Sequence, residues 1–372
     1  MRSHLSGTSR SELLEAILLV GGQGTRLRPL TIGTPKPLLP TVGVPFLAHQ
    51  LAKAAAAGVT RVILATAYRA PMFAECLGDG SQFGLAIEYV QEDVPLGTGG
   101  AIRNAAAALR SEPESPVLVL NGDVLSGHDL AAQVELHVKA EAAVTLHLVE
   151  VPDPARFGCV PIDAAGRVTA FLEKTPDPVT NRINAGCYVF RREVIDRIPA
   201  GRVVSVERET FPELIEAGAV VLGHPDTSYW LDVGTPEAFV QGSCDLVLGR
   251  LASPALAGVS GIPAESLVLG GADIHPAART GGGTVIGAGS RIGEGADVTG
   301  SVLFDDVRIG AGARVRASVL GRGARIGEGA VLDDAVIGEG AVVAAGNELR
   351  GGLRLWPGVE LGPTSVRFST DA

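Results

Sequence analysis

Hydrophobic residues in the first third of the chain form short runs that are separated by small and polar residues. The runs that are long enough for buried strands lie at 17–20, 61–65, 86–90 and 117–120. Segments 45–57 and 101–109 suit helices, with Pro45 favouring a first turn and Gly58 a stop. This alternation predicts a mostly parallel sheet with helices on both faces and ligands at the carboxyl ends of its strands.

The pattern changes in the middle of the chain. From 144 to 188 the predicted strands are shorter and separated by turns, which is typical of a lobe that covers a second substrate. A helix is predicted from 236 to about 251, and small residues and prolines then fill 252–263, as in a linker.

In the last third, apolar residues return every six positions, in groups that repeat after 17 residues. This spacing predicts a left-handed parallel β-helix with three short faces per coil. We expect the apolar side chains to point inward and the glycines that follow them to help turn the corners. The apolar positions are Ile286, Ile292, Val298, Leu303, Ile309, Val315, Leu320, Ile326, Leu332, Ile337, Val343 and Leu349, and the glycines are Gly287, Gly293, Gly310, Gly321, Gly327 and Gly338.

The length of 372 residues allows two or three domains. We predict an α/β domain over 1–250 with a flexible leader at 1–13, a linker at 251–264 and the β-helix over 265–372. Some β-helices are acyltransferases, which generally need a histidine base. The β-helix has one histidine, His275 in its least regular coil, so we interpret it as a scaffold, oligomer contact or regulatory surface of a homo-oligomer.

Charge and cysteine content narrow the function. The chain carries 31 Lys and Arg against 41 Asp and Glu, a net charge of −10, and it has no basic run, which disfavours nucleic-acid binding. Its four cysteines are scattered, so we expect reduced thiols and no zinc site. The apolar run after the polar N-terminus is too short for a signal peptide or membrane span. We therefore expect a soluble cytoplasmic protein without a membrane partner.

The predicted strand at 17–20 ends in the glycine-rich sequence Gly21-Gly22-Gln23-Gly24. Glycines let backbone N–H groups curl around an anion, and Arg26, Arg28 and Lys36 follow closely. A strand, a glycine-rich loop and nearby cations are typical of a polyphosphate site. The sequence fits neither a P-loop nor a dinucleotide motif. The alternative is a glycine turn that only links a strand to a helix.

Two carboxylates follow predicted strands. Asp123 ends the run 117–123, with Gly122 clearing space beside it, and Asp232 follows the sequence Tyr229-Trp-Leu. A carboxylate at a strand end that faces phosphates suggests a Mg²⁺ ligand. Capping of the next turn is the alternative for Asp123, and surface pairing is the alternative for Asp232.

The run 21–31 together with Pro35-Lys36-Pro37 resembles the signature of sugar-1-phosphate nucleotidyltransferases. The resemblance implies a Rossmann-like catalytic domain, to which a left-handed β-helix is sometimes appended. It matches Leu96-Gly-Thr-Gly-Gly100 to a loop that holds the nucleobase, although such residues are also ordinary turn punctuation. The nucleotide-binding residues that we expect are Val20, Gly21, Gly22, Gly24, Thr25, Gln91, Glu92, Gly97 and Thr98.

The sugar phosphate is assigned by further matches to the same family. They are Phe157-Gly-Cys-Val160, Phe171-Leu-Glu-Lys174 and Ile183-Asn-Ala-Gly-Cys-Tyr188. The family usually has proline directly after the lysine, whereas here Pro176 comes one residue late. The expected sugar-phosphate residues are Gly122, Gly158, Glu173, Lys174 and Asn184.

The resemblance implies attack by a sugar 1-phosphate oxygen on the α-phosphorus of a nucleoside triphosphate, with release of pyrophosphate. Positioning and charge neutralisation dominate such a reaction, and the nucleophile is already ionised, so no general base is needed. The expected catalytic residues are Arg26, Lys36 and Lys174, with Asp123 and Asp232 holding Mg²⁺. A non-catalytic regulatory paralogue is the alternative, but such proteins tend to lose one of these five residues.

Within the family, the closest match is to mannose-1-phosphate guanylyltransferases. It rests on the 95–100 and 184–188 motifs, on 204–212, and on a β-helix of this length. We therefore expect GTP and mannose 1-phosphate as substrates and GDP-mannose as product, with glucose-1-phosphate thymidylyl-, uridylyl- and adenylyltransferases as alternatives. Gln91 and Glu92 are candidate acceptors for the donor edge of guanine, and main-chain carbonyls of the same loop are the alternative.

Overall fold

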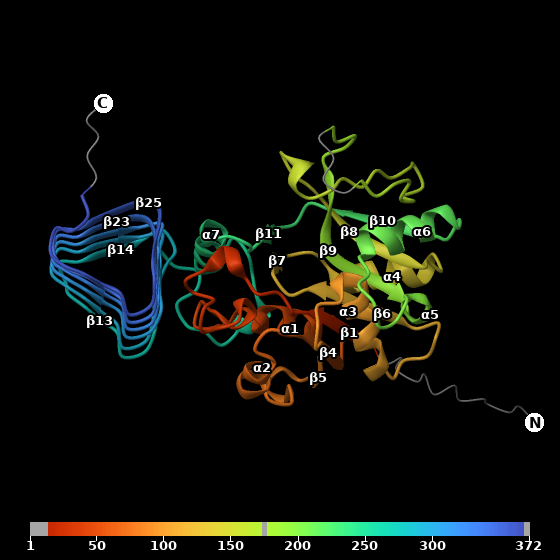
Figure 1. Ribbon diagram of the computed structural model, residues 1–372, viewed down its shortest axis with the longest axis horizontal. Helices are drawn as coiled ribbons and strands as arrows, with labels where there is room; N and C mark the ends of the chain where they lie inside the picture. Colours follow the sequence, from red (N-terminus) through yellow and green to blue (C-terminus); the bar gives the residue numbers. More distant parts are fainter. Residues whose placement is uncertain (1–13, 173–176, 368–372) are drawn as a thin grey trace, which may run out of the picture.

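The computed structural model describes residues 14–172 and 177–367. The predicted leader at 1–13, together with Glu173 and Lys174, lies outside these residues. Figure 1 shows two bodies side by side, a β-helix seen end-on as a triangle and a larger α/β body. Among the described helices, none is both long and apolar enough to cross a membrane.

Seven strands form the central sheet of the α/β body, in the order β10-β8-β9-β6-β1-β4-β5. All neighbours in this sheet pair in parallel except β9, which is antiparallel to β6 and β8. This confirms the predicted mostly parallel sheet. The strands are β1 (Glu15–Leu19), β4 (Arg61–Thr66), β5 (Ala86–Gln91), β6 (Pro116–Asn121), β8 (Val144–Glu150), β9 (Arg182–Arg191) and β10 (Val221–Asp226).

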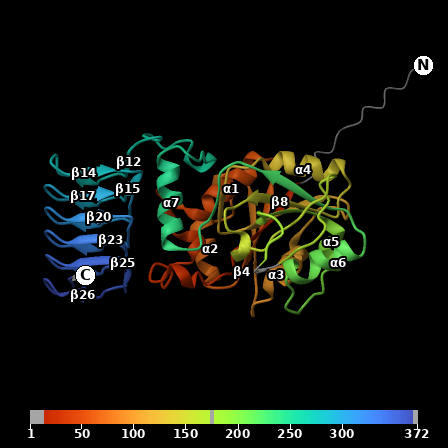
Figure 2. The same cartoon turned by 90° about the horizontal axis from the view of Figure 1, so that it is seen from above.

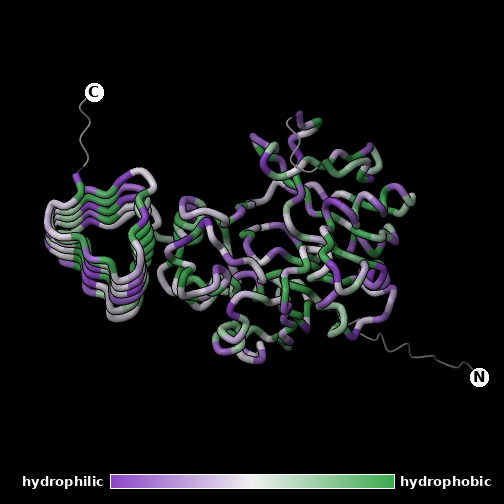
Figure 3. Tube along the Cα trace, viewed as in Figure 1, coloured by the Kyte–Doolittle hydropathy of each residue, from purple (hydrophilic) through white to green (hydrophobic). Residues whose placement is uncertain are grey.

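Helices cover both faces of the sheet because successive side chains of a strand point to opposite sides. Ile17 of β1 belongs to a buried cluster with residues of α3, α5 and α6, and its neighbour Leu18 belongs to a cluster with residues of α1, α2 and α4. Hydrophobic segments, in green, run through the middle of this body (Figure 3). The helices are α1 (Phe46–Ala56), α2 (Ala70–Leu77), α3 (Gly97–Ala105), α4 (Leu130–Lys139), α5 (Arg192–Arg197) and α6 (Phe211–Glu216).

Two short strands connect the sheet to the last helix of this body. β7 (Val124–Ser126) and β11 (Trp230–Asp232) pair antiparallel, with Asp232 opposite Val124. α7 (Pro236–Val247) follows β11, and the hydroxyl of its N-cap, Thr235, accepts a hydrogen bond from the Ala238 N–H. α7 ends earlier than the predicted residue 251.

The C-terminal strands form parallel sheets in which residues of neighbouring coils pair with a spacing of 17 positions through the middle coils and of 18 at the first and last coils. Ile286 pairs with Leu303 and Leu303 with Leu320, as the repeat predicts. All twelve predicted inward positions are buried, each at most 4% exposed. Figure 2 shows the coils stacked as layers. The strands are β12 (Ser266–Val268), β13 (Asp273–Ile274), β14 (Arg279–Gly281), β15 (Thr284–Ile286), β16 (Arg291–Ile292), β17 (Asp297–Thr299), β18 (Val302–Leu303), β19 (Arg308–Ile309), β20 (Arg314–Arg316), β21 (Val319–Leu320), β22 (Arg325–Ile326), β23 (Val331–Ile337), β24 (Val342–Val343), β25 (Glu348–Leu355) and β26 (Glu360–Leu361).

The structure gives a different reason for the glycines that follow the inward residues. A Cβ on Gly287 would lie 2.3 Å from the Phe304 carbonyl carbon of the next coil, and one on Gly310 would lie 2.6 Å from the Glu328 nitrogen. These glycines are therefore needed for close stacking of the coils. The left-handed backbone of the corner comes two residues later, for example at Gly289 with φ 68°.

One face of the β-helix packs against the α/β body. Val285, Val302, Val319 and Val336, one from each of four coils, are buried in a cluster that also contains residues of α7 and of the loop after β1. In register they form a column along the interface. This apolar contact joins the two bodies.

Candidate active site

The glycine-rich loop begins directly after β1. The Val20 N–H donates to the Ala65 carbonyl at 3.0 Å, and Gly24 adopts a left-handed conformation, with φ 60°, before the short 3-10 turn η1 (Thr25–Leu27). The Thr31 hydroxyl fixes this turn by donating to the Gly24 carbonyl at 2.8 Å. A Cβ on Gly22 would meet nothing within 4 Å, so this part of the loop is open to a ligand.

Lys36 and Asp123 form an ion pair across the loop. The Lys36 Nζ donates to Asp123 Oδ2 at 2.9 Å, with the lysine side chain 9% exposed and the aspartate side chain 40% exposed. Asp123 follows β6, and the preceding Gly122 N–H donates to the Leu19 carbonyl at 2.9 Å. A Cβ on Gly122 would lie 2.6 Å from that carbonyl oxygen. Gly122 therefore clears space for β1.

Asp232 lies beside Asp123 because β11 pairs with β7, and the Val233 N–H donates to the Asp123 carbonyl at 2.9 Å. Asp232 Oδ1 is buried without a hydrogen-bond partner. Burial and then the charge of Asp123 raise the pKa of Asp232, against the opposing effects of Lys36 and Arg26. An orphaned carboxylate oxygen beside a second carboxylate is an arrangement that a divalent cation would satisfy.

The donor set limits the kind of metal that these residues could hold. Within the described part of the chain, no group of three or more His, Cys, Asp or Glu side chains is placed to share a metal. Two carboxylates suit Mg²⁺, which keeps several waters and binds substrate phosphates, better than an all-protein cage of Ca²⁺ or Zn²⁺. The two aspartates therefore fit the predicted metal.

Arg26 lies over the turn that follows Asp232. A Cβ on Gly234 would be 2.5 Å from the Arg26 Nη2 and 2.8 Å from its Cζ. Gly234 thus makes room for the guanidinium next to the carboxylate pair. Gly234 was not among the residues predicted from the sequence, although its place directly after Asp232-Val233 could have indicated it.

The loop matched to the nucleobase is the first turn of α3, which begins at Gly97, four residues before the predicted start. Gly97 has φ 72°, and a Cβ on it would lie 2.6 Å from the Val204 carbonyl oxygen. A Cβ on Gly99 would lie 2.8 Å from the Val204 Cγ1. The glycines therefore permit close packing of the Val204 segment, in addition to any approach by a ligand.

Thr98 and Glu92 differ in how their polar atoms are used. The Thr98 hydroxyl donates to Glu207 Oε2 at 2.7 Å and accepts from the Val206 N–H at 3.0 Å. Glu92 Oε2 accepts from the Leu96 N–H at 3.4 Å, whereas its Oε1 is buried without a partner. Burial raises the pKa of Glu92. Glu92 therefore has a buried oxygen without a partner, whereas the Thr98 hydroxyl already makes two hydrogen bonds within the protein.

A cleft of about 540 Å³ brings most of the predicted nucleotide and catalytic residues together. Asp232 is joined to it through Asp123 and Gly234. Gln91 is exposed at the end of β5 and does not line the cleft. The predicted residues that line it are Val20, Gly21, Gly22, Gly24, Thr25, Arg26, Lys36, Glu92, Gly97, Thr98, Gly122 and Asp123.

The predicted sugar-phosphate residues are less well gathered. Asn184 donates to the Tyr188 hydroxyl at 2.7 Å and accepts from the Gly186 N–H at 3.1 Å, so its amide is occupied within β9. Gly158 has φ 101° and, like Asn184, does not line the cleft. Glu173 and Lys174 lie outside the described residues. Among the described members of this set, Gly122 lines the cleft and Gly158 and Asn184 do not.

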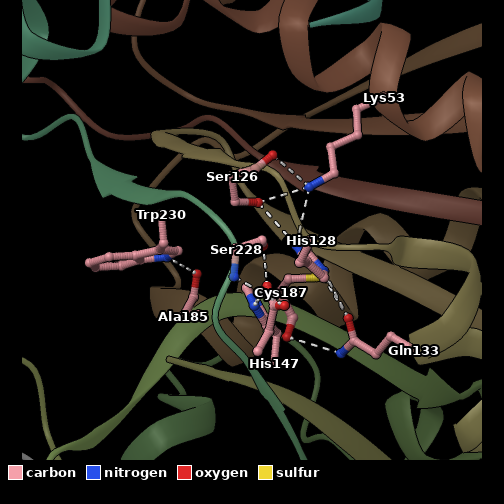
Figure 4. A network of polar contacts seen from close by, with 10 residues as sticks. Lys53, Ser126, His128, Gln133, His147, Ala185, Cys187, Ser228 and Trp230 are labelled. Atoms are coloured by element: carbon pink, nitrogen blue, oxygen red, sulfur yellow. Dashed lines mark hydrogen bonds and ion pairs between the residues drawn. The ribbon is translucent and has the colours of Figure 1, made fainter. Parts of the chain in front are cut away.

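A buried polar network includes Ser126 of β7, together with Lys53, His128 and His147 (Figure 4). The Lys53 Nζ donates to the Ser126 carbonyl at 2.8 Å, and His128 and His147 stack with ring centroids 3.7 Å apart. Burial lowers the pKa of Lys53 to about 8, that of His147 to about 4 and that of His128 to about 2. Burial also lowers the pKa of His49 and of His137 to about 4.

These neutral histidines predict acid-sensitive stability. The pKa of each of these histidines is lower in the folded protein than in the unfolded chain, so on acidification the unfolded chain binds protons first. The folded state therefore has its full stability above pH 6.5 and loses stability as the pH falls towards about 4. Each such histidine adds a slope of about 1.4 kcal/mol per pH unit. We expect urea midpoints to fall steeply between pH 6.5 and 4.5 and His137→Gln to flatten the slope. His275→Gln, at an exposed site, should not alter it. A flat profile would contradict this account.

Comparison with known proteins is consistent with the geometry. A family model described as nucleotidyl transferase matches residues 15–247, and one described as the GMPPB C-terminal domain matches 262–354. The chain is 57% identical to the mannose-1-phosphate guanylyltransferase of Mycobacterium tuberculosis, over 96% of this chain and 98% of that protein. It is 38% identical to the catalytic subunit beta of the Drosophila melanogaster mannose-1-phosphate guanylyltransferase, over 62% of each chain.

A solved structure has a similar fold. The crystal structure of HddC from Yersinia pseudotuberculosis, complexed with GMP-PN, superposes with a TM-score of 0.52 at 28% identity. The match covers 62% of this chain and 97% of HddC.

Proposed function

This chain belongs to the nucleotidyl transferase family, and from that premise we propose that it makes GDP-mannose and pyrophosphate from GTP and mannose 1-phosphate. The observation that carries the choice of substrates is the 57% identity to the mycobacterial mannose-1-phosphate guanylyltransferase over 96% of this chain. The cleft supports the same chemistry, since it joins a glycine-rich loop, two cations and two carboxylates.

The chain's own residues would act mainly by position and charge. The backbone of Gly21 to Thr25 and the guanidinium of Arg26 would hold the triphosphate, and Arg26 would neutralise the charge that develops on the leaving pyrophosphate. The sugar phosphate is already ionised near neutral pH, so the nucleophile needs no base. Lys174 would receive it, as the motif Phe171-Leu-Glu-Lys174 suggests.

Asp123 and Asp232 would hold Mg²⁺. When bound, the ion would neutralise charge on the α-phosphate and help to align it. Lys36 pairs with Asp123 at 2.9 Å, so its ammonium lies beside the carboxylates that would hold the ion. From this place in the cleft the ammonium of Lys36 would contribute a compact positive charge to the triphosphate.

The substrate assignment is tested by a panel of ATP, GTP, UTP and dTTP, each with mannose 1-phosphate and glucose 1-phosphate. We expect the highest kcat/KM for GTP with mannose 1-phosphate, measured by pyrophosphate release. A preference for UTP or dTTP would overturn the guanylyl assignment. Absence of turnover with every pair would favour a regulatory paralogue.

A change at Gly22 tests the phosphate loop. A Cβ there meets no protein atom within 4 Å, so Gly22→Ala should fold normally. If the triphosphate approaches this backbone, the added methyl group should weaken GTP binding by about tenfold or more. Titration calorimetry with GTP gives the affinity.

The matched control is Gly33→Ala, where a Cβ also meets nothing within 4 Å and no positive φ is imposed. It should leave both the melting temperature and the GTP affinity unchanged. Equal affinities for Gly22→Ala and the wild type would contradict the loop assignment.

A further inference from the structure

One side chain of the β-helix reaches the signature loop of the α/β body. Arg354 of β25 donates through Nη1 to the carbonyl of Arg26 at 2.7 Å and to the carbonyl of Arg28 at 2.8 Å. These carbonyls lie on either side of Leu27, at the end of η1. The partners are 328 and 326 positions away in the sequence. Figure 2 shows the segment after β1, in red, at the level of the last coils.

The position of Arg354 in the coil makes this contact unusual for the β-helix. Arg354 pairs with Val336 and thus continues the column of Val285, Val302, Val319 and Val336 that packs against the α/β body. In the coil after Val336, an arginine therefore takes the place of a buried valine. The earlier coils contact the α/β body through buried apolar side chains at this position, whereas this coil contacts it through two charge-assisted hydrogen bonds of Arg354.

A local irregularity places Arg354 in that column. β23 and β25 pair with an offset of 17 residues up to Asp333 and Arg350, and with an offset of 18 from Ala335 and Leu353 onward. Gly351 and Gly352, with φ 63° and 79°, take up the extra residue. Without this insertion Leu353 would occupy the column position.

The charge of Arg354 also acts weakly on two carboxylates, Glu237 and Asp334. Glu237 is in the first turn of α7, three residues after Gly234, and its pKa is lowered by the Thr235 hydroxyl and, more weakly, by Arg354. The pKa of Asp334 is raised by burial and by Glu237, and Arg354 opposes this rise. The contacts that fix the guanidinium are therefore its two hydrogen bonds to the backbone of Arg26 and Arg28, and its effect on the two carboxylates is secondary.

We propose that Arg354 is a positioning residue, through which the β-helix holds the η1 turn so that the Arg26 guanidinium stays over Gly234, next to Asp232. Arg354 itself does not touch substrate. The backbone of Arg26 is held from the β-helix side while its side chain is presented to the cleft. The β-helix thus contributes to triphosphate binding in cis, which is a more specific role than a scaffold. This inference rests on the proposed function.

The test uses the full chain and the variant Arg354→Val, which restores the valine of the column and so suits the fold. Loss of both bonds should reduce kcat/KM for GTP by about tenfold, while KM for mannose 1-phosphate stays within about twofold. Arg354→Lys keeps the positive charge but loses the planar arrangement of guanidinium donors, so we expect its kcat/KM for GTP to lie between those of Arg354→Val and the wild type. The control is Arg308→Met, an exposed arginine of β19 on another face.

A double-mutant comparison separates positioning from general stability. GTP affinity, measured by calorimetry, should fall in Arg354→Val but should not fall further when Arg354→Val is added to Arg26→Ala. Additive losses, or an unchanged GTP affinity with only a lower melting temperature, would overturn the inference. A failure of the proposed function would appear as absent turnover in the wild type, which is a different outcome.

Discussion

Asp232→Asn is expected to lower turnover with GTP and mannose 1-phosphate by about 100- to 1,000-fold at saturating Mg²⁺. The variant keeps the shape of the side chain but removes the charge that would hold the cation. In contrast to its turnover, the thermal stability of Asp232→Asn should not fall. The Asp232 Oδ1 is buried without a partner and its pKa is raised, so neutralising it removes an unfavourable buried charge. The melting temperature should therefore stay equal or rise.

Asp123→Asn is the matched comparison. It should cause a similar loss of turnover, but it also leaves the buried Lys36 ammonium without its anion. Its melting temperature should therefore fall, since breaking such a pair uncovers the cost of the remaining charge. Steady-state kinetics and differential scanning calorimetry on both variants check these signs. Near-normal turnover in both would contradict the metal assignment, and equal stability changes would contradict the electrostatic account.

Glu92→Gln is expected to reduce the preference for GTP over ATP by about a hundredfold, mainly through a lower kcat/KM for GTP. The N1–H and N2–H₂ groups of guanine donate side by side, and Glu92 has a buried acceptor with no partner at the edge of the cleft. A carboxylate that pairs with guanine stands unpaired against adenine, and an amide weakens that discrimination.

The matched control for this experiment is Gln91→Ala. Gln91 is the other acceptor that the sequence suggested, but it is exposed and outside the cleft, so its removal should not change the ranking of nucleotides. Kinetics with GTP and ATP for both variants give the comparison. An unchanged ranking in Glu92→Gln would favour recognition by main-chain carbonyls.

The fold could be predicted from the sequence because its signals are local and periodic. The run 17–20 is apolar because its strand is buried in the sheet, and the 17-residue repeat arises because successive coils bury equivalent side chains. The structure confirms both patterns. The start of α3 could not be predicted in this way. Gly97, Gly99 and Gly100 look like a loop, but packing of Val204 against them makes a helical turn stable.

Site residues that belong to a continuous sequence motif could be predicted. Residues whose role depends on contact with a distant segment of the chain were missed. The glycine-rich loop, Lys36 and Asp123 all line one cleft, as the resemblance implied. Gly234 matters only because the Arg26 side chain folds over it. The bonds of Arg354 connect residues 328 and 326 positions apart, through a register shift that the repeat does not foretell.

The most direct test of nucleotidyl transfer is to follow GTP and mannose 1-phosphate with Mg²⁺ by phosphorus NMR in the presence of the full chain. The account predicts that pyrophosphate and a sugar nucleotide with two linked phosphorus signals appear in equal amounts, and that adding pyrophosphate drives the reaction backward. Release of orthophosphate from GTP without a sugar nucleotide, or an unchanged spectrum, would contradict it.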